Sequence, residues 1–297
     1  MSRLNPPSAE TGQTPAMQGK TVVISGATSG IGEVAALALA RQGARIVLIA
    51  RDRERAERTR QRLQGAAPGT THPVHYADLA QLTEMKRVAA EIAAAEPRID
   101  VLINNAGALF GRRELTADGL ERTFATNHLA YFVVTRLLLE RLRATPAARI
   151  VSTASDAHRG ARLDFADLQS ERRYRSLAVY GRSKLMNILF TRELARRLAG
   201  SGVTANCLHP GFVATRFGEA GSGALMRWGL RFAKRFALDP QQGSETLIFL
   251  ATSPSVPEVT GEYFHRCRPV DPTPAARSDA DARQLWEISA QLAGLTD

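Results

Sequence analysis

Short apolar runs alternate along the chain with longer segments in which apolar residues recur every three or four positions. The short runs are rich in β-branched residues, a pattern typical of strands buried on both faces of a parallel sheet. The longer segments have the spacing of helices with one apolar face. Strands are therefore expected at residues 20–25, 45–50, 75–79, 100–103, 149–153 and 203–208, and helices at 33–42, 51–64, 83–96, 119–143 and 241–251, with a further helix that carries Tyr180 and ends near residue 198.

The alternation of strands and helices predicts an α/β fold, a Rossmann-type doubly wound parallel sheet in a single domain. No internal repeat or interior linker divides the chain, so the domain is expected to span residues 19–297. Residues 1–18 are polar and contain Pro, without the apolar segment of a signal peptide, and are expected to form a disordered tail on a cytoplasmic protein. No run reaches the roughly 18 apolar residues of a membrane helix, so no integral membrane segment is expected.

A glycine-rich turn follows the first predicted strand and leads into the first predicted helix. Its sequence is Gly26-Ala27-Thr28-Ser29-Gly30-Ile31-Gly32. In a strand, turn and helix of this kind, glycines let the backbone approach a pyrophosphate at the helix N-terminus, so the turn predicts a dinucleotide site. The spacing is GxxxGxG and departs from the GxGxxG fingerprint. The candidate cofactor-binding residues here are Gly26, Thr28, Ser29, Gly30, Ile31 and Gly32.

The residue after the second predicted strand indicates which cofactor is used. An NAD-binding site usually has an acidic residue there to bind the ribose hydroxyls. This chain has Ala50-Arg51-Asp52, and the guanidinium of Arg51 can pair with a ribose 2′-phosphate. NADP is therefore the expected cofactor, with NAD as the alternative. Arg51 could instead be a surface residue that opens an Arg-rich helix.

Two further strand ends supply candidate cofactor contacts. Asp78 and Leu79 close the third strand, where an adenine ring would lie, and Asp78 could also cap the helix that follows. The fourth strand ends in Asn104-Asn105-Ala106-Gly107. Small residues and amides at the carboxyl end of a strand suit a wall that a cofactor approaches closely, so Asn105, Ala106 and Gly107 are also candidates.

Tyr180 and Lys184 are the candidate acid/base pair. Residues four apart on a helix share a face, so the phenol and the ammonium can point into one cleft. A cation beside a phenol favours the phenolate and is expected to lower the pKa of Tyr180, as a general acid/base acting on a carbonyl or alcohol requires. Asn127 lies within an apolar helical stripe and is expected to have a buried partner.

These motifs, in this order, resemble those of the short-chain dehydrogenase/reductase family, from about residue 20 to the C-terminus. The branch it resembles is the retinol dehydrogenase-like one, because Tyr180 follows Ser155 by 25 positions, further than in typical members, and because 167–171 and 285–289 look like segments of that branch. Relatives commonly carry two adjacent serines where this chain has Ala154-Ser155. Ser155 is therefore the assigned catalytic serine, with Ser152 as the alternative.

The resemblance implies the role of each site residue. Tyr180 would exchange a proton with the substrate oxygen, Ser155 would hold that oxygen, and Lys184 would lower the pKa of Tyr180 and bind the nicotinamide ribose. Asn127 would anchor a water in a proton relay. The turn after the sixth strand would complete the cofactor site through Pro210, Gly211, Val213 and Thr215, with Thr215 fixing the carboxamide. The family also implies a homo-oligomer formed through the helices around Asn127 and Tyr180.

A basic amphipathic segment, 217–238, lies where the family has its variable substrate lid. Its aromatic and aliphatic residues favour a lipophilic aldehyde, ketone or alcohol as substrate. The predicted function is therefore NADP-dependent oxidation and reduction of such a compound. The alternative of a different class is a catalytically idle cofactor sensor or scaffold, which the presence of Ser155, Tyr180 and Lys184 argues against.

Composition adds little beyond charge. The formal net charge is +10, but Arg residues are scattered over many predicted helices, which favours a solvated surface over a nucleic-acid site. The basic segment could instead contact an anionic membrane surface. Cys207 and Cys267 are far apart and have no metal-ligand spacing, so free thiols in a reducing compartment and no metal are expected. His158 and His209 are interpreted as structural.

Overall fold

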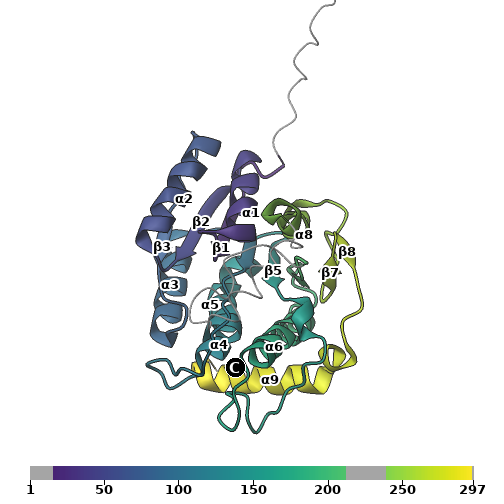
Figure 1. Cartoon of the computed structure of the whole chain (residues 1–297). Coiled ribbons are helices and arrows are strands. Elements are labelled where there is room, and N and C mark those ends of the chain that lie inside the picture. The colour runs from purple at the N-terminus through teal and green to yellow at the C-terminus, as the bar shows by residue number, and fades with distance from the viewer. Residues whose placement is uncertain (1–15, 212–238, 296–297) are drawn as a thin grey trace, which may run out of the picture.

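The computed structural model describes residues 16–211 and 239–295, which form a sheet with helices on both faces (Figure 1). Within these residues the sheet has eight strands in the order β3-β2-β1-β4-β5-β6-β7-β8. All neighbouring pairs are parallel except β7 and β8. The strands are β1 (Thr21–Ser25), β2 (Arg45–Ala50), β3 (Val74–Tyr76), β4 (Val101–Asn104), β5 (Arg149–Thr153), β6 (Thr204–Leu208), β7 (Tyr263–His265) and β8 (Arg268–Pro269). The predicted Rossmann-type fold is confirmed.

The helices cover the sheet in two layers because alternate strand residues point to opposite faces. Val22 and Ile24 pack with α1 and α8 on one face, whereas Val23 packs with α3, α5 and α6 on the other. The helices are α1 (Gly30–Arg41), α2 (Arg53–Ala66), α3 (Leu82–Ala95), α4 (Arg122–Phe124), α5 (Ala130–Arg143), α6 (Ser176–Arg197), α8 (Pro240–Thr252) and α9 (Asp279–Ala293), and the shorter segments are η1 (Ala125–Leu129), η2 (Asp156–His158) and η4 (Pro274–Arg277).

The predicted long helix at 119–143 is not a uniform α-helix. It begins at Arg122 as α4, passes through η1, a π-helical turn, and continues as α5. Glu121, which the prediction placed inside the helix, is its N-cap, and its carboxylate accepts hydrogen bonds from the amides of Thr123 and Phe124. The π-helical turn carries Asn127. A turn of this kind changes the direction in which a side chain leaves the helix, and apolar periodicity alone does not reveal it.

Both ends of the predicted core are extended by the structure. Met17, within the predicted tail, is buried, and its amide donates to the carbonyl of Gln42. At the other end, 241–251 was expected to be the last core helix, but α9 follows it and packs along α6 beneath the sheet (Figure 1). The predicted lid, 217–238, lies outside the described residues.

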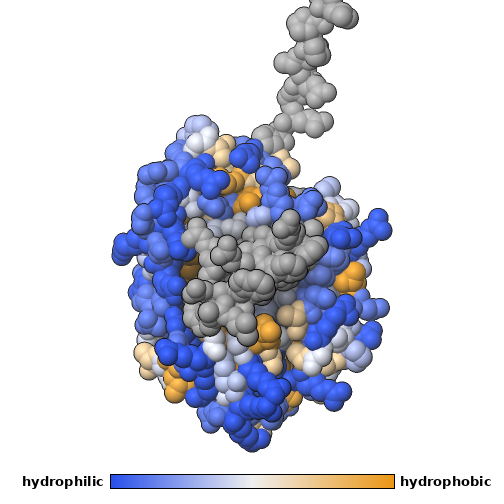
Figure 2. Space-filling model, in the orientation of Figure 1, coloured by the Kyte–Doolittle hydropathy of each residue, from blue (hydrophilic) through white to orange (hydrophobic). Residues whose placement is uncertain are grey.

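The surface in the same orientation is mainly hydrophilic, with scattered hydrophobic residues (Figure 2). Much of the basic excess is paired locally: on α2, Arg60 contacts Glu57 at 2.6 Å and Arg62 contacts Glu33 at 2.6 Å. Exposed pairs of this kind contribute little stability. They agree with the expectation that the arginines form a solvated surface.

An aromatic cluster attaches α9 to the rest of the molecule. The ring of Trp286 is 4.9 Å from that of Phe132 on α5 and 5.9 Å from that of Phe190 on α6. Beside the cluster, the Nε2 atom of His128 lies 2.9 Å from the Ser289 hydroxyl. All of these side chains are buried, so α9 belongs to the core.

We expect Trp286→Ala to lower the free energy of unfolding by about 3–5 kcal/mol, because it removes a buried aromatic side chain and leaves a cavity between three helices. Urea denaturation measures the change. Leu115→Ala is the control, since Leu115 is 54% exposed and its loss should cost less than about 0.5 kcal/mol. Equal stability of the two variants would show that α9 is not part of the cooperative unit.

Candidate active site

The strand order brings the predicted site residues to one edge of the sheet. The chain moves outward from β1 to β3 and then returns to place β4 beside β1, so the order reverses between these two strands. In open α/β sheets, ligands bind at the carboxyl ends of the strands beside such a reversal. The glycine-rich turn follows β1, Asn105 follows β4, Ser155 follows β5 and Pro210 follows β6.

Two glycines of the turn are required by close packing. A Cβ on Gly32 would lie 2.4 Å from the carbonyl oxygen of Gly26, and one on Gly26 would lie 2.7 Å from the Cα of Ala106. Gly26 also has a φ of +69°. Ser29, the N-cap of α1, makes no side-chain cap hydrogen bond, so amides of the first turn can receive an anionic group. This geometry fits the pyrophosphate of a dinucleotide.

Asn105 joins three strand ends. Its Nδ2 atom donates to the Gly26 carbonyl (3.0 Å), and its Oδ1 atom accepts from the Thr153 hydroxyl (3.1 Å). The Ser25 hydroxyl accepts hydrogen bonds from the amides of Asn105 and Ala106. The predicted cofactor wall is thus held by side chains of β1 and β5. Ser25 and Thr153 could not be predicted for this role, because their partners are far away along the chain.

The adenosine end of the predicted site contains an ion pair. Arg51 is 65% exposed on its side chain, and its guanidinium lies 3.8 Å from the carboxylate of Asp78. Asp52, not Arg51, is the N-cap of α2. The suggestion that Asp78 caps the next helix is wrong, because the N-cap of α3 is Gln81 and the Asp78 carboxylate accepts from the amide of Ala80. Leu79 is buried.

Tyr180, Ser155 and Lys184 come together as predicted. The Ser155 hydroxyl lies close enough to the Tyr180 phenol to act on its pKa. The Lys184 ammonium is buried, donates to the carbonyl of Thr153 (2.9 Å) and lies 5.6 Å from the centre of the Tyr180 ring. Ser152 is buried within β5, paired with strands on both sides, which favours Ser155 as the serine of the site.

The expected pKa shift of Tyr180 is wrong for this structure. Burial raises the pKa of Tyr180 above its ordinary value, although the neighbouring Ser155 hydroxyl acts in the opposite direction. Burial also lowers the pKa of Lys184 to about 7, so its amine is cationic only in part at neutral pH. Attraction between the phenol and the ammonium favours the predicted shift, but both groups lose hydration on burial, and this loss dominates.

Asn127 has the buried partners that its position in an apolar stripe predicted. Its Oδ1 atom accepts from the amide of Ala108 (2.8 Å), and its Nδ2 atom donates to the Ala108 carbonyl (2.9 Å) and to the Ser183 hydroxyl (3.0 Å). Ser183 in turn donates to the carbonyl of Tyr180 (2.7 Å). Ser183, which the sequence analysis passed over, thus links Asn127 to the helix of Tyr180. The water relay stays a prediction.

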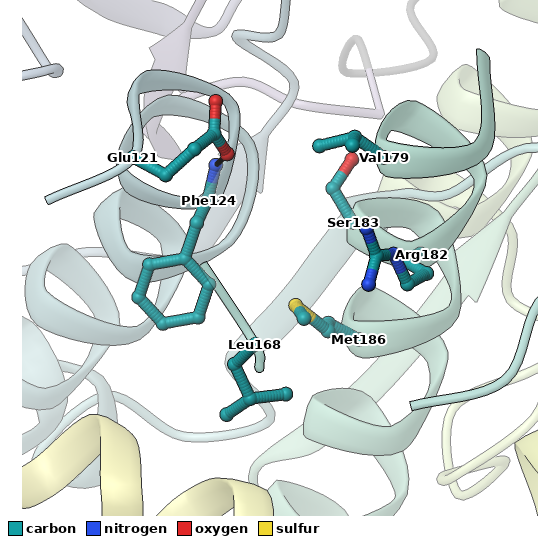
Figure 3. Close-up of a pocket in the computed structure, with 7 residues that line it drawn as sticks. All are labelled: Glu121, Phe124, Leu168, Val179, Arg182, Ser183 and Met186. Carbon is teal, nitrogen blue, oxygen red and sulfur yellow. Dashed lines mark hydrogen bonds between the residues drawn. The ribbon is translucent and has the colours of Figure 1, made fainter. Parts of the chain in front are cut away.

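The long segment between Ser155 and Tyr180 packs against the two helices of the site. Its Gln169 side chain accepts from the amide of Glu121 (2.8 Å), and its Ser170 hydroxyl accepts from Arg182 (2.6 Å). Figure 3 shows Glu121 and Phe124 facing the α6 side chains across a gap. The gap has a volume of about 180 Å³ but is too narrow to hold a water molecule, so it is packing space and not a substrate site.

The last predicted cofactor contacts are described only in part. Gly211 has a φ of +82°, and its amide donates to the Nδ1 atom of His209 (3.2 Å) just after Pro210. Val213 and Thr215 lie outside the described residues.

In residues 16–211 and 239–295, no helix is long and apolar enough to cross a membrane. The same part of the chain contains no group of three or more His, Cys, Asp or Glu side chains placed to hold a metal ion. Both cysteines are free thiols, as expected.

The buried amine of Lys184 makes stability depend on pH. Its pKa is lowered from about 10.5 in the unfolded chain to about 7 in the folded protein. Burial of the charged amine therefore lowers the free energy of unfolding most below pH 7, and this cost disappears above pH 10.5, where the amine is neutral in both states. We expect the free energy of unfolding of the cofactor-free protein to rise between pH 7 and 10 relative to that of Lys184→Met. Urea denaturation at several pH values tests this, and parallel pH dependences of the two proteins would contradict it.

Comparisons with known proteins agree with this site. The family model described as short chain dehydrogenase matches residues 20–222. Retinol dehydrogenase 14 of Mus musculus is 42% identical over 291 residues, which cover 94% of this chain and 87% of that protein. A crystal structure of an uncharacterised protein from Mycobacterium paratuberculosis has 32% identity and a TM-score of 0.76, covering 96% of this chain and 98% of that one. A short chain dehydrogenase from Burkholderia cenocepacia in complex with NADP has 26% identity and a TM-score of 0.67, covering 84% and 96%. The family match and the 42% identity to a retinol dehydrogenase show that the chain belongs to the short-chain dehydrogenase/reductase family, in its retinol dehydrogenase-like branch.

Proposed function

We propose that this protein is an NADP-dependent oxidoreductase that interconverts a lipophilic aldehyde or ketone and its alcohol. The observation that carries the proposal is the neighbouring Ser155 and Tyr180 hydroxyls with the Lys184 amine buried beside them. A protein that only senses a cofactor has no need for a hydroxyl pair next to a titratable amine. The oxidoreductase activity itself follows from the family.

In the proposed reduction, Tyr180 donates its phenolic proton to the carbonyl oxygen of the substrate. Ser155 donates a hydrogen bond to the same oxygen and stabilises the negative charge that develops there. The raised pKa of Tyr180 keeps the phenol protonated, ready to act as the acid. A bound nicotinamide supplies the hydride. In the oxidation of an alcohol the proton moves in the opposite direction: the Tyr180 phenolate, stabilised by the Lys184 ammonium, takes the hydroxyl proton and becomes a phenol.

The preference for NADP rests on the position of Arg51. Its exposed guanidinium lies at the end of β2, where the ribose 2′-position is expected, and the nearby carboxylate of Asp78 is 3.8 Å away. A 2′-phosphate would offer Arg51 two oxygens in place of one weakly paired carboxylate. The related Burkholderia cenocepacia structure, solved with NADP, supports the proposal.

An apolar rim supports the lipophilic substrate. Leu177 is 68% exposed and lies three residues before Tyr180, hence on the same face of α6. The loop of Phe110 is fixed beside it, because the Phe110 carbonyl accepts from the hydroxyls of Tyr174 (3.1 Å) and Ser176 (2.7 Å). An exposed leucine next to a catalytic tyrosine favours apolar substrates, and the similar protein from mouse is named for its action on retinol. The cytoplasmic location, the homo-oligomer and any contact with a membrane surface stay predictions.

We expect Tyr180→Phe to lower kcat for NADPH-dependent reduction by about 10²–10⁴-fold, the usual contribution of a general acid. A panel of decanal, benzaldehyde, 2-decanone and retinal is the assay, and the affinity for NADPH, measured by fluorescence, is expected to be unchanged. Undiminished turnover by the variant would refute the role of Tyr180. No consumption of NADPH with any lipophilic carbonyl, despite tight binding of NADPH, would favour the idle sensor.

We expect Arg51→Ala to weaken NADPH binding by about 10–100-fold, since a hydrogen-bonded charge contributes about 1.5–3 kcal/mol, and to leave NADH binding unchanged. Arg58→Ala is the matched control, because Arg58 lies on α2 and pairs with Glu54 on the surface. Isothermal titration with both cofactors gives the comparison. An equal loss for NADPH and NADH would remove the argument for NADP.

A further inference from the structure

His158 connects the catalytic serine to a distant part of the chain. It is fully buried at the end of η2, three residues after Ser155. Its Nδ1 atom lies 2.8 Å from the carbonyl oxygen of Ser155. Its Nε2 atom lies 3.4 Å from the amide nitrogen of Thr273, the residue before η4 on the path to α9.

These two contacts determine the protonation of the ring. A carbonyl oxygen can only accept, so Nδ1 must carry a hydrogen to bond to Ser155. A backbone amide can only donate, so Nε2 must be unprotonated to accept from Thr273. Both conditions hold only for the neutral Nδ1–H tautomer. A cationic ring would direct the Nε2 hydrogen at the hydrogen of the Thr273 amide.

The surroundings of His158 also disfavour a positive charge. The His158 ring and the Tyr263 ring pack edge to face, with their centres 5.1 Å apart. Tyr263 also stacks with His209, and the centre of the His209 ring lies 3.9 Å from that of His265. The nearest charged groups are Asp156 and Arg159 on the same segment, and they pair with each other. Burial lowers the pKa of His158 below its ordinary value of 6.5.

The position of the Ser155 backbone matters because α6 packs directly on η2. A Cβ on Gly181, the residue after Tyr180, would lie 2.5 Å from the carbonyl oxygen of Ala157. Ser155 and Tyr180 are therefore held beside each other through two tightly packed backbones. A shift of the Ser155 carbonyl would move the hydroxyl relative to the phenol.

We propose that neutral His158 is a positioning residue for the reaction, which fixes Ser155 against Tyr180 by bridging the Ser155 carbonyl and the Thr273 amide. The inference rests on the proposed function and adds to it a residue that touches neither substrate nor cofactor. If the ring must stay neutral to position Ser155, kcat should fall at acid pH, below the ordinary pKa of histidine, as the ring becomes protonated. A histidine that only fills space would not produce this decline.

Two substitutions separate the parts of the bridge. His158→Asn keeps a donor near the Nδ1 position and cannot be protonated, so it should retain most of kcat and lose the decline at acid pH. His158→Gln reaches the Nε2 position but lacks the donor to Ser155, so kcat should fall by about 10–100-fold, as a small misplacement of a catalytic group causes. The assay is NADPH-dependent reduction of the best aldehyde of the panel from pH 5 to 9.

His75→Asn is the matched control. His75 lies on β3, and among the described residues its side chain is hydrogen bonded only to Glu91. The His75 variant should therefore keep the pH profile of the wild type. KM for NADPH should be unchanged in all three variants. If His158→Gln keeps the kcat and the pH profile of the wild type while Tyr180→Phe is inactive, the positioning role is refuted and the proposed function stands.

A measurement without turnover tests the same inference. The ¹⁵N chemical shifts of the His158 ring, assigned by comparison with His158→Asn, should show a protonated Nδ1 and an unprotonated Nε2 at pH 7. A cationic ring or the Nε2–H tautomer would overturn the proposal whatever the enzyme assays show. If instead Tyr180→Phe keeps full activity, it is the proposed function that fails.

Discussion

A line of hydrogen bonds across the carboxyl edge of the sheet holds the site together. It runs from the Gly26 carbonyl through the amide of Asn105 to Thr153, whose carbonyl accepts from Lys184. Each connection joins residues far apart in sequence, and the region is largely buried, so a lost partner would leave a polar group unsatisfied. The cofactor wall and the catalytic helix are therefore positioned by one network, and a change at either end is transmitted to the other.

The same network explains why small residues surround it. Gly32 lies so close to Asn105 that a Cβ would approach the side-chain amide nitrogen to 2.5 Å, and a Cβ on Gly26 would approach that nitrogen to 3.1 Å. Burial of the Lys184 amine is costly, and its lowered pKa expresses the cost. A site that tolerates such a group has traded stability for a titratable amine beside the phenol, as functional sites commonly do.

Strands, helices and the first contacts of the site could be predicted from sequence because each depends on local pattern. Apolar periodicity located β1 to β6 but missed β7 and β8, which are only three and two residues long. The position of Tyr180 relative to Lys184 put both on one face of α6. The failures have a different origin. The π-helical turn at Asn127 and the raised pKa of Tyr180 depend on tertiary packing and burial, which no spacing encodes. The partners of Ser183 and His158 are also long-range, and a single sequence does not distinguish such residues from ordinary buried ones.

The position of α9 at the end of the chain determines which part of the fold packs last. Phe132 and Phe190 lie on helices made in the middle of the chain, yet the ring that covers them belongs to Trp286. During synthesis the chain emerges from its N-terminus, so this apolar surface and the polar atom of His128 stay exposed until α9 has been made. The half of the site built on η1 and α6 thus reaches its final packing last, and nascent chains that stop before Asp279 expose the surface that the finished protein hides.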